Sequence, residues 1–186
     1  MKVSKEQAEL NRIALLDAAS RLYRRHGFDG VGVAQIAREA GLTHGSLYGH
    51  FESKDHYAAE ACAHAFKKSL DLLKRFDDDG DQPLASFRRR YLSEAYRDDP
   101  GNGCTIAALA ADAARKPGPV AETMTQGIES FIDAFTERLD GREHAMTTLS
   151  MMVGALILAR ASAQANASLS KELLDTVLGT LDEPGA

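Results

Sequence analysis

The residues best suited to bind another molecule lie together between Val33 and Phe51, in the segment VAQIAREAGLTHGSLYGHF. His44 and Ser46 are hydrogen-bonding side chains near the start of a predicted short helix, and Gly45 between them leaves room for close backbone approach. Side chains in the first turn of such a helix can reach base edges in the major groove of DNA. The spacing therefore predicts that His44 and Ser46 contact bases.

Residues that can contact the DNA backbone flank this group. Thr43 offers a hydroxyl and an amide, and Tyr48 can bring its hydroxyl to a phosphate or its ring to a thymine methyl group. His50 can donate to a phosphate, and Lys54 adds a positive charge at a helix start, where an anion is already favoured. Taken alone, Tyr48 is more often a core residue and His50 an ordinary surface histidine, so this prediction depends on the whole pattern.

Two short helices around a tight turn must position these side chains. Gly41 follows the first helix where a left-handed residue is needed, and Thr43 can cap the second helix. Apolar residues spaced to face a common core occur on both predicted helices: Ile36, Ala37, Ala40, Leu47 and Phe51. This arrangement is typical of a helix-turn-helix element.

The segment also resembles a known family, the TetR-type transcriptional regulators, through the pattern I-A-x-x-A-G-[LV]-[ST]-x-G-x-L-Y-x-H-F-x-S-K. The matching residues are Ile36, Ala37, Ala40, Gly41, Leu42, Thr43, Gly45, Leu47, Tyr48, His50, Phe51, Ser53 and Lys54. Residues 15–23, followed by His26-Gly27-Phe28, resemble the first helix of the family. The resemblance implies phosphate contacts by Thr43, Tyr48, His50 and Lys54, and base contacts by His44, Gly45 and Ser46.

One position departs from the family pattern. Family members often have Ser or Thr where Val33 stands, and that hydroxyl caps the helix and touches a phosphate. Val33 can do neither, and Gly32 can offer only backbone amides.

The remainder of the chain predicts further helices and an all-α fold. The expected helices run from a cap at Ser4 to Gly27, from Ser53 to about Phe76, from Pro83 to about Arg97, from about Thr105 to Arg115, from the break at Lys116-Pro117-Gly118-Pro119 to Leu139, from about Arg142 to Ala165, and over 171–181 with Ser170 as cap. We expect a three-helix helix-turn-helix DNA-binding domain over residues 1–54. A larger helical ligand-binding and dimerisation domain is expected over 55–186.

The last two predicted helices carry an apolar stripe that could pair with a second copy of the chain, as in the resembled family. The stripe consists of Met152, Val153, Leu156, Ile157, Arg160, Leu174, Val177, Leu178 and Leu181. The alternative is the ordinary core of a monomer. We favour a homodimer because two recognition helices on a palindrome give most of the specificity of such a motif.

The resemblance further implies a small-molecule pocket between these helices and the DNA-binding part. Candidate lining residues are Phe66, Leu70, Phe87, Tyr91, Cys104, Met124, Ile128, Phe131 and Phe135, each of which could equally be a core residue. Such a lining favours an apolar or aromatic ligand.

Charge and composition fit this division. The net charge is −5, but residues 1–56 carry 8 Lys and Arg against 7 Asp and Glu, so the acidic excess lies in the rest of the chain. The two cations Arg24 and Arg25 could stabilise a helix C-terminus or lie near the DNA backbone. The run Arg88-Arg89-Arg90 is typical of a solvated helix face.

No apolar run approaches the roughly 20 residues that span a bilayer, and the N-terminus lacks a signal segment, so we expect a cytoplasmic protein.

The sequence predicts no cofactor, no metal site and no enzyme. Cys62 and Cys104 lack zinc-ligand spacing and read as reduced structural residues, with a thiol sensor as the alternative. No phosphate loop, dinucleotide fingerprint or Glu-x-x-His motif occurs.

We therefore expect a dimeric regulator, most simply a repressor that leaves a palindromic operator when a mostly apolar ligand binds. An interaction module that kept the fold and lost DNA binding is the second hypothesis.

Overall fold

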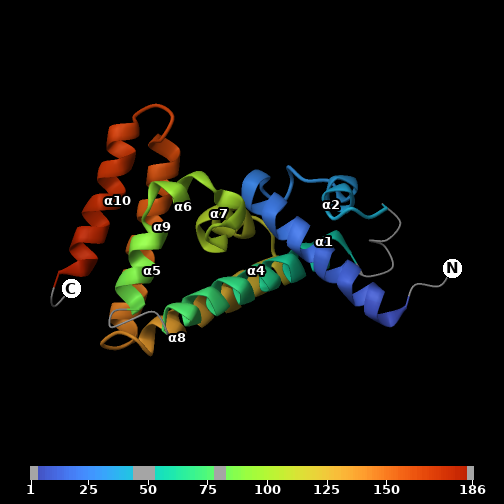
Figure 1. The fold of residues 1–186 in the computed structure, drawn as a ribbon, viewed down its shortest axis with the longest axis horizontal. Coiled ribbons are helices and arrows are strands. Elements are labelled where there is room, and N and C mark those ends of the chain that lie inside the picture. Colours follow the sequence, from blue (N-terminus) through green and yellow to red (C-terminus); the bar gives the residue numbers. More distant parts are fainter. Residues whose placement is uncertain (1–3, 44–52, 78–82, 184–186) are drawn as a thin grey trace.

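The computed structural model describes residues 4–43, 53–77 and 83–183, and every regular element in these ranges is a helix. The predicted all-α class is confirmed. Figure 1 shows the N-terminal helices at one end of the long axis and the last two helices at the other end.

Three of the described helices meet at the N-terminal end. α1 (Lys5–His26) begins at Ser4, whose side chain accepts from the backbone N–H of Gln7, and it ends at Gly27 with φ of 73°. α2 (Val33–Glu39) follows, and α4 (Lys54–Phe76) begins at its cap Ser53. These three boundaries were predicted from the cap residues and are confirmed. We call α1, α2 and the first turns of α4 the headpiece.

α4 connects the headpiece to the rest of the molecule. It packs against α1 near its start and against α8 (Pro119–Thr136) along its length, so one continuous helix belongs to both parts. Figure 1 shows α4 and α8 side by side. The domain boundary at residue 54 stays a prediction, although a shared helix gives a direct mechanical link across it.

The C-terminal body contains α5 (Pro83–Tyr91), α6 (Glu94–Asp98), the 3₁₀ turn η1 (Pro100–Asn102), α7 (Thr105–Ala113), α8, α9 (Arg142–Ser162) and α10 (Ala167–Asp182). α9 packs between α8 and α10. Aromatic rings fill the space between α4, α5 and α8: the Phe87 and Phe135 centroids lie 6.0 Å apart, and those of Phe66 and Phe131 lie 6.3 Å apart.

The predicted helix from Pro83 to Arg97 is wrong, because the chain breaks it into α5 and α6. Ser93 adopts an extended conformation, accepts from the backbone N–H of Tyr96 and donates to the carbonyl of Arg90. A serine that caps the next turn competes with helix continuation. The break redirects the chain toward η1.

Ser170 was expected to cap the last helix, and that prediction is wrong too. Asn166 caps α10, with its side chain accepting from the N–H of Leu169. Ser170 lies one turn inside the helix, fully buried, and donates to the carbonyl of Ala159 over 2.7 Å. The ends of α7, α8 and α9 fall two or three residues before the predicted ends.

Replacing Ser93 with alanine should destabilise the protein by about 1 kcal/mol, because a helix loses its cap. Urea unfolding followed by circular dichroism measures this change. Ser130→Ala is the matched control, since the exposed Ser130 only donates to a carbonyl of its own helix. Equal effects of the two substitutions would contradict a special role for Ser93.

Within the described residues, α9 has the length and apolar composition of a membrane-crossing helix. Core helices of globular domains share these properties, and α9 lies between two other helices. Its buried apolar residues therefore serve helix packing in this structure.

Candidate nucleic-acid interface and regulatory cavity

The headpiece has its own small core, which fixes α2 relative to α1. Tyr23 and Phe28 are buried with their ring centroids 5.3 Å apart, and Ile36 of α2 is completely buried. Tyr57 of α4 is also completely buried and donates to the carbonyl of Leu15 over 2.7 Å. Burial raises the pKa of the Tyr57 hydroxyl, so it stays a donor at neutral pH.

Two of the predicted DNA contacts lie at the edges of the described part of the headpiece. Thr43 is exposed just after the turn at Gly41, where φ is 69°, and Lys54 is exposed at the first residue of α4. The other five predicted contacts, His44, Gly45, Ser46, Tyr48 and His50, lie outside the described residues. Their roles therefore stay predictions from the sequence.

The start of α2 confirms that the departure at Val33 has a structural consequence. Gly32 occupies the cap position, and no side chain caps this end of the helix. Val33 is partly buried and packs against the core. The position thus exchanges a cap and a polar contact for apolar packing.

A cavity of about 160 Å³ lies between the headpiece and the C-terminal body. α1 contributes Asp17, Ser20, Arg21 and Arg24, and four predicted pocket residues, Phe87, Tyr91, Cys104 and Phe131, form its inner wall. Its position between the two parts means that a ligand there would touch both.

The other predicted pocket residues lie elsewhere. Phe66 and Leu70 line a second, more open hollow of about 390 Å³ between α4 and α8. Met124 and Phe135 are buried in the core, Ile128 is partly buried against it, and none of the three lines either cavity. The phenyl ring of Phe66 lies where a Cβ on Gly127 would be, 2.3 Å from its nearest carbon, so α4 and α8 are in close contact there.

The polar side of the first cavity was not predicted from the sequence. Arg24 was read as a helix end or a DNA contact, yet its Nε donates over 2.9 Å to the carbonyl of Gly101 in η1. Its Nη1 also lies 3.4 Å from the hydroxyl of Thr105. The available signal was the position of Arg24 on α1, one turn beyond Ser20, which is a buried residue of the same helix.

The carboxylate in the cavity already has partners. Asp17 accepts from His64 over 2.7 Å and from Lys68. Burial raises the pKa of Asp17, but the hydrogen bonds from Lys68 and His64 lower it by more, so its pKa lies below the usual value. Asp17 is therefore a charged, bonded group at neutral pH.

Three buried residues at or near the cavity, Tyr91, Cys104 and Cys62, carry hydroxyl or thiol groups. The hydroxyl of Tyr91 is buried and has no hydrogen-bond partner among the described residues. Cys104 sits at the start of α7, where its Sγ accepts from the N–H of Ala107 over 3.4 Å. Burial raises the pKa of the Cys62 thiol to about 12, so that residue stays protonated and unreactive.

The predicted dimer stripe divides into buried and exposed residues. Met152, Leu156, Leu174 and Leu181 are buried in the core of the single chain, whereas Val153, Val177 and Leu178 are only partly buried against it. Ile157 is 43% exposed, and three apolar residues that the stripe did not include are exposed with it: Met146, Leu158 and Leu169. Contact with a second chain can thus involve only the outer residues.

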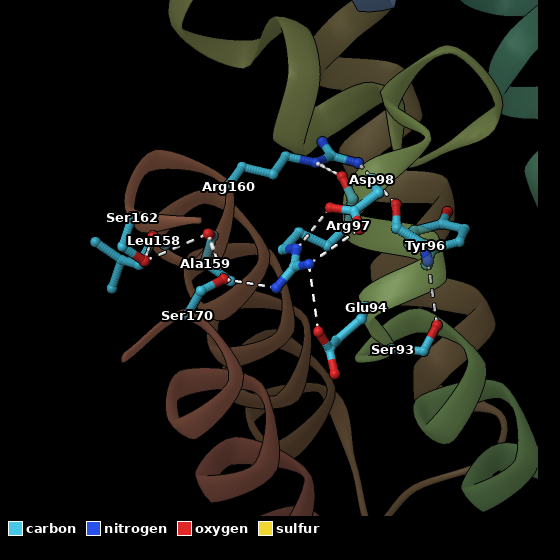
Figure 2. A network of polar contacts seen from close by, with 10 residues as sticks. All are labelled: Ser93, Glu94, Tyr96, Arg97, Asp98, Leu158, Ala159, Arg160, Ser162 and Ser170. Carbon is cyan, nitrogen blue, oxygen red and sulfur yellow. Dashed lines mark hydrogen bonds and ion pairs between the residues drawn. The ribbon is translucent and has the colours of Figure 1, made fainter. Parts of the chain in front are cut away.

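Arg160 is engaged within the chain and holds α6 to α9. Its guanidinium donates to the carbonyl of Arg97 over 3.1 Å and lies 3.3 Å from that of Tyr96, as Figure 2 shows. Arg97 itself is buried, pairs with Asp98 and donates to the hydroxyl of Ser170 over 2.9 Å. These bonds tie α6, which carries Tyr96 of the cavity, to the α9–α10 pair.

Arg88 was predicted to lie on a solvated face, and the structure contradicts this. It is buried and donates to the carbonyl of Leu181, near the end of α10. Burial lowers the pKa of its guanidinium. Its neighbours Arg89 and Arg90 are exposed, as predicted.

Comparison with known sequences gives matches of one kind. The model for bacterial regulatory proteins of the tetR family matches residues 15–61. The HTH-type transcriptional regulator LmrA of Bacillus subtilis is 27% identical over 134 residues, which cover 69% of this chain and 71% of that protein. The regulator TtgR of Pseudomonas putida is 31% identical over 91 residues, which cover 48% and 43% of the two chains.

Solved structures extend the likeness to the whole fold. The reduced form of E. coli NemR superposes with a TM-score of 0.79 at 18% identity, covering 95% of this chain and 99% of that one. A TetR-family transcriptional regulator from Agrobacterium tumefaciens gives 0.76 at 19% identity, covering 93% and 98%. At these identities the likeness concerns the arrangement of helices.

Proposed function

Because the chain belongs to the TetR family of transcriptional regulators, we propose that it is a dimeric repressor that releases a palindromic operator when a small molecule binds. The observation that supports this most is the position of the 160 Å³ cavity, which α1 of the headpiece and α4 to α8 of the body line together. A ligand there contacts the DNA-binding part and the body at once.

In this proposal, the headpiece binds DNA and the protein acts in the cytoplasm. His44, Gly45 and Ser46 read bases, while Thr43, Tyr48, His50 and Lys54 hold phosphates. The exposed positions of Thr43 and Lys54, on either side of the proposed recognition helix, support this assignment. The acidic body lies away from the DNA, so the net charge of −5 does not oppose binding.

The α9–α10 face is the proposed contact between protomers. Ile157, Leu158 and Met146 expose apolar side chains on α9, and Leu169 does so on α10. A symmetric dimer covers such a face on both copies and sets the spacing of two recognition helices. The inducer acts through differential affinity for a conformer with a different spacing.

An interaction module without DNA binding is the second candidate, favoured by two observations. Val33 replaces the usual polar contact with apolar packing, and the headpiece segment is nearly neutral in charge.

The similar proteins named above are transcriptional regulators and not enzymes, which is consistent with the absence of catalytic motifs in the sequence.

Selection of genomic fragments on the full-length protein, followed by footprinting, tests the repressor proposal. We expect one or a few fragments with two protected half-sites related by a dyad, occupied by two protomers. Expression from a reporter behind the fragment should fall when the protein is present. Recovery of unrelated fragments with no shared sequence would refute the proposal and favour the interaction module.

A further inference from the structure

The cavity between α1 and the body differs from the apolar pocket that the sequence suggested. Its volume, about 160 Å³, is close to that of an engineered ~150 Å³ cavity that binds benzene, so it suits a molecule with a single ring. Aromatic side chains supply part of its wall, with the rings of Tyr91 and Tyr96 centred 5.0 Å apart and those of Phe87 and Tyr91 6.0 Å apart. A planar ring fits such surroundings.

Arg24 brings a positive charge into this cavity without a carboxylate partner. Its hydrogen bonds go to the carbonyl of Gly101 and to the hydroxyl of Thr105, both of which are neutral. No acidic group among the described residues forms an ion pair with it, in contrast to its neighbours Arg21 and Arg25. A guanidinium removed from water gains most from an anion that accepts two hydrogen bonds in parallel.

Tyr91 adds a second unused donor on the same wall. Tyr91 is 4% exposed, and its hydroxyl makes no hydrogen bond of regular geometry among the described residues, with only the weakly accepting thiol of Cys104 beside it. A buried hydroxyl without a partner carries a desolvation cost that an accepting ligand atom removes. Arg24 and Tyr91 both donate, so the complementary ligand group is an acceptor.

The balance of charges in the cavity also favours an anion. Arg21, Arg24 and Lys68 are cationic, and Asp17 is the one carboxylate among the lining residues. His64 and Lys68 already bond that carboxylate, and Lys68 is more than half exposed. These cationic side chains would therefore repel a cationic ligand and attract a carboxylate.

We infer, on the basis of the proposed function, that the cavity binds a single-ring aromatic carboxylate, which accepts hydrogen bonds from Arg24 and Tyr91 and draws Arg24 away from Gly101. The Nε and Nη2 of Arg24, which bond the Gly101 carbonyl, form the edge of the guanidinium that gives a carboxylate two parallel hydrogen bonds, so a carboxylate on that edge displaces the carbonyl. Binding of the acid therefore weakens the attachment of α1 to η1.

The rest of the structure directs that change to the headpiece. η1 and α6 are held from the other side, because Arg160 bonds the carbonyls of Tyr96 and Arg97, and Arg97 bonds Ser170 of α10 (Figure 2). The guanidinium of Arg160 also lies close enough to Gly103 that a Cβ there would meet it at 2.7 Å. With η1 fixed to the body, loss of the Arg24 contact loosens α1 on η1, where the ion pair of Arg25 with Asp99 remains.

Calorimetric titration of the full-length protein with benzoate, benzamide and benzylamine tests the ligand class. We expect benzoate to bind at least about tenfold more tightly than its neutral isostere benzamide, and benzylamine to bind most weakly. Arg24→Gln should remove the preference for benzoate, and Tyr91→Phe should lower benzoate affinity about fivefold. Arg25→Gln, which changes the adjacent arginine outside the cavity lining, should keep the preference.

Equal affinities for benzoate and benzamide in the unaltered protein would overturn the ligand class, as would an undiminished preference in Arg24→Gln. Circular dichroism shows whether each variant folds, and Tyr91→Phe decides the question if Arg24→Gln does not. This titration contains no DNA, so its failure leaves operator binding intact, and a failure of operator binding leaves the titration valid.

Release of DNA tests the mechanical part separately. Saturating benzoate should lower operator affinity at least tenfold in the unaltered protein and leave it unchanged in Arg24→Gln. Benzoate that binds with the expected preference but leaves operator affinity unchanged would overturn the role of the Arg24–Gly101 contact.

Discussion

Replacement of Leu158 by glutamate should convert the protein from a dimer to a monomer at micromolar concentration. Leu158 is 55% exposed on α9, beside the exposed Ile157, and a symmetric interface would bury the new charge on both copies. An unpaired buried charge costs about 3–5 kcal/mol. The dimer dissociation constant should therefore rise by about a thousandfold or more, which sedimentation equilibrium measures.

Leu10→Glu is the matched control for this substitution. Leu10 has the same exposed fraction, 55%, but lies on α1 in the headpiece, far from α9. Its variant should keep the mass of the unaltered protein. If Leu158→Glu also stayed dimeric, the α9–α10 face would not be the interface, and if the unaltered protein were a monomer, the two-half-site model would be wrong.

His44→Ala should lower operator affinity by about a hundredfold and leave affinity for unrelated DNA nearly unchanged. A good base contact contributes about 1–3 kcal/mol to discrimination, and a dimer loses it in both half-sites. Fluorescence anisotropy with the operator and with a scrambled duplex measures both quantities. The specificity ratio should collapse while the protein remains folded.

Lys54→Met provides the contrast, because Lys54 is proposed to contact phosphate and not a base. It should weaken binding to all sequences to a similar extent and reduce the slope of log K against log salt by about one for each protomer. A loss of specificity in Lys54→Met, or a uniform loss in His44→Ala, would reverse the assigned roles.

The headpiece could be predicted from the sequence because its signals are local. Ser4, Gly27 and Ser53 act on backbone groups within a few residues, and the structure places helix ends at each of them. Gly41 likewise has the left-handed conformation that the turn requires, with φ of 69°. The helix caps and turns of the headpiece could therefore be predicted, because they depend on hydrogen bonds and backbone conformations within a few residues in sequence.

The break at Ser93 and the interior position of Ser170 could not be predicted in the same way. A serine can cap a helix, lie inside one or lie in a loop, and contacts with residues distant in sequence decide which of these it does. Ser170 is buried where α10 packs on α9, and it accepts there from Arg97, which lies 73 residues away in sequence. Asn166 supplied the competing cap signal four residues earlier.

The cavity depends on pairs of residues far apart in the chain. Arg24 meets Gly101 across 77 residues, and Asp17 meets Lys68 across 51. The apolar wall was partly predictable, since Phe87, Tyr91, Cys104 and Phe131 lie on helices with buried faces. The polar wall was not, because charged residues on α1 resemble a solvated face until the body is placed against them.

Periodicity showed that α9 carries an apolar stripe but could not say what covers each part of it. Met152 and Leu156 are buried within the single chain, where α9 packs against α7, α8 and α10, and the face with Ile157 and Leu158 stays exposed. Three-dimensional packing separates these neighbouring residues into core and candidate interface.

Fluorescence anisotropy with the intergenic DNA beside the gene for this protein tests the central claim most directly. The titration is made at physiological salt with excess competitor DNA, using the full-length protein and its Tyr48→Ala variant. Saturable, salt-dependent binding that the competitor does not abolish and that Tyr48→Ala does is the predicted result. Binding to this DNA, and to genomic fragments generally, no tighter than to random sequence would contradict the claim that the chain is a sequence-specific regulator.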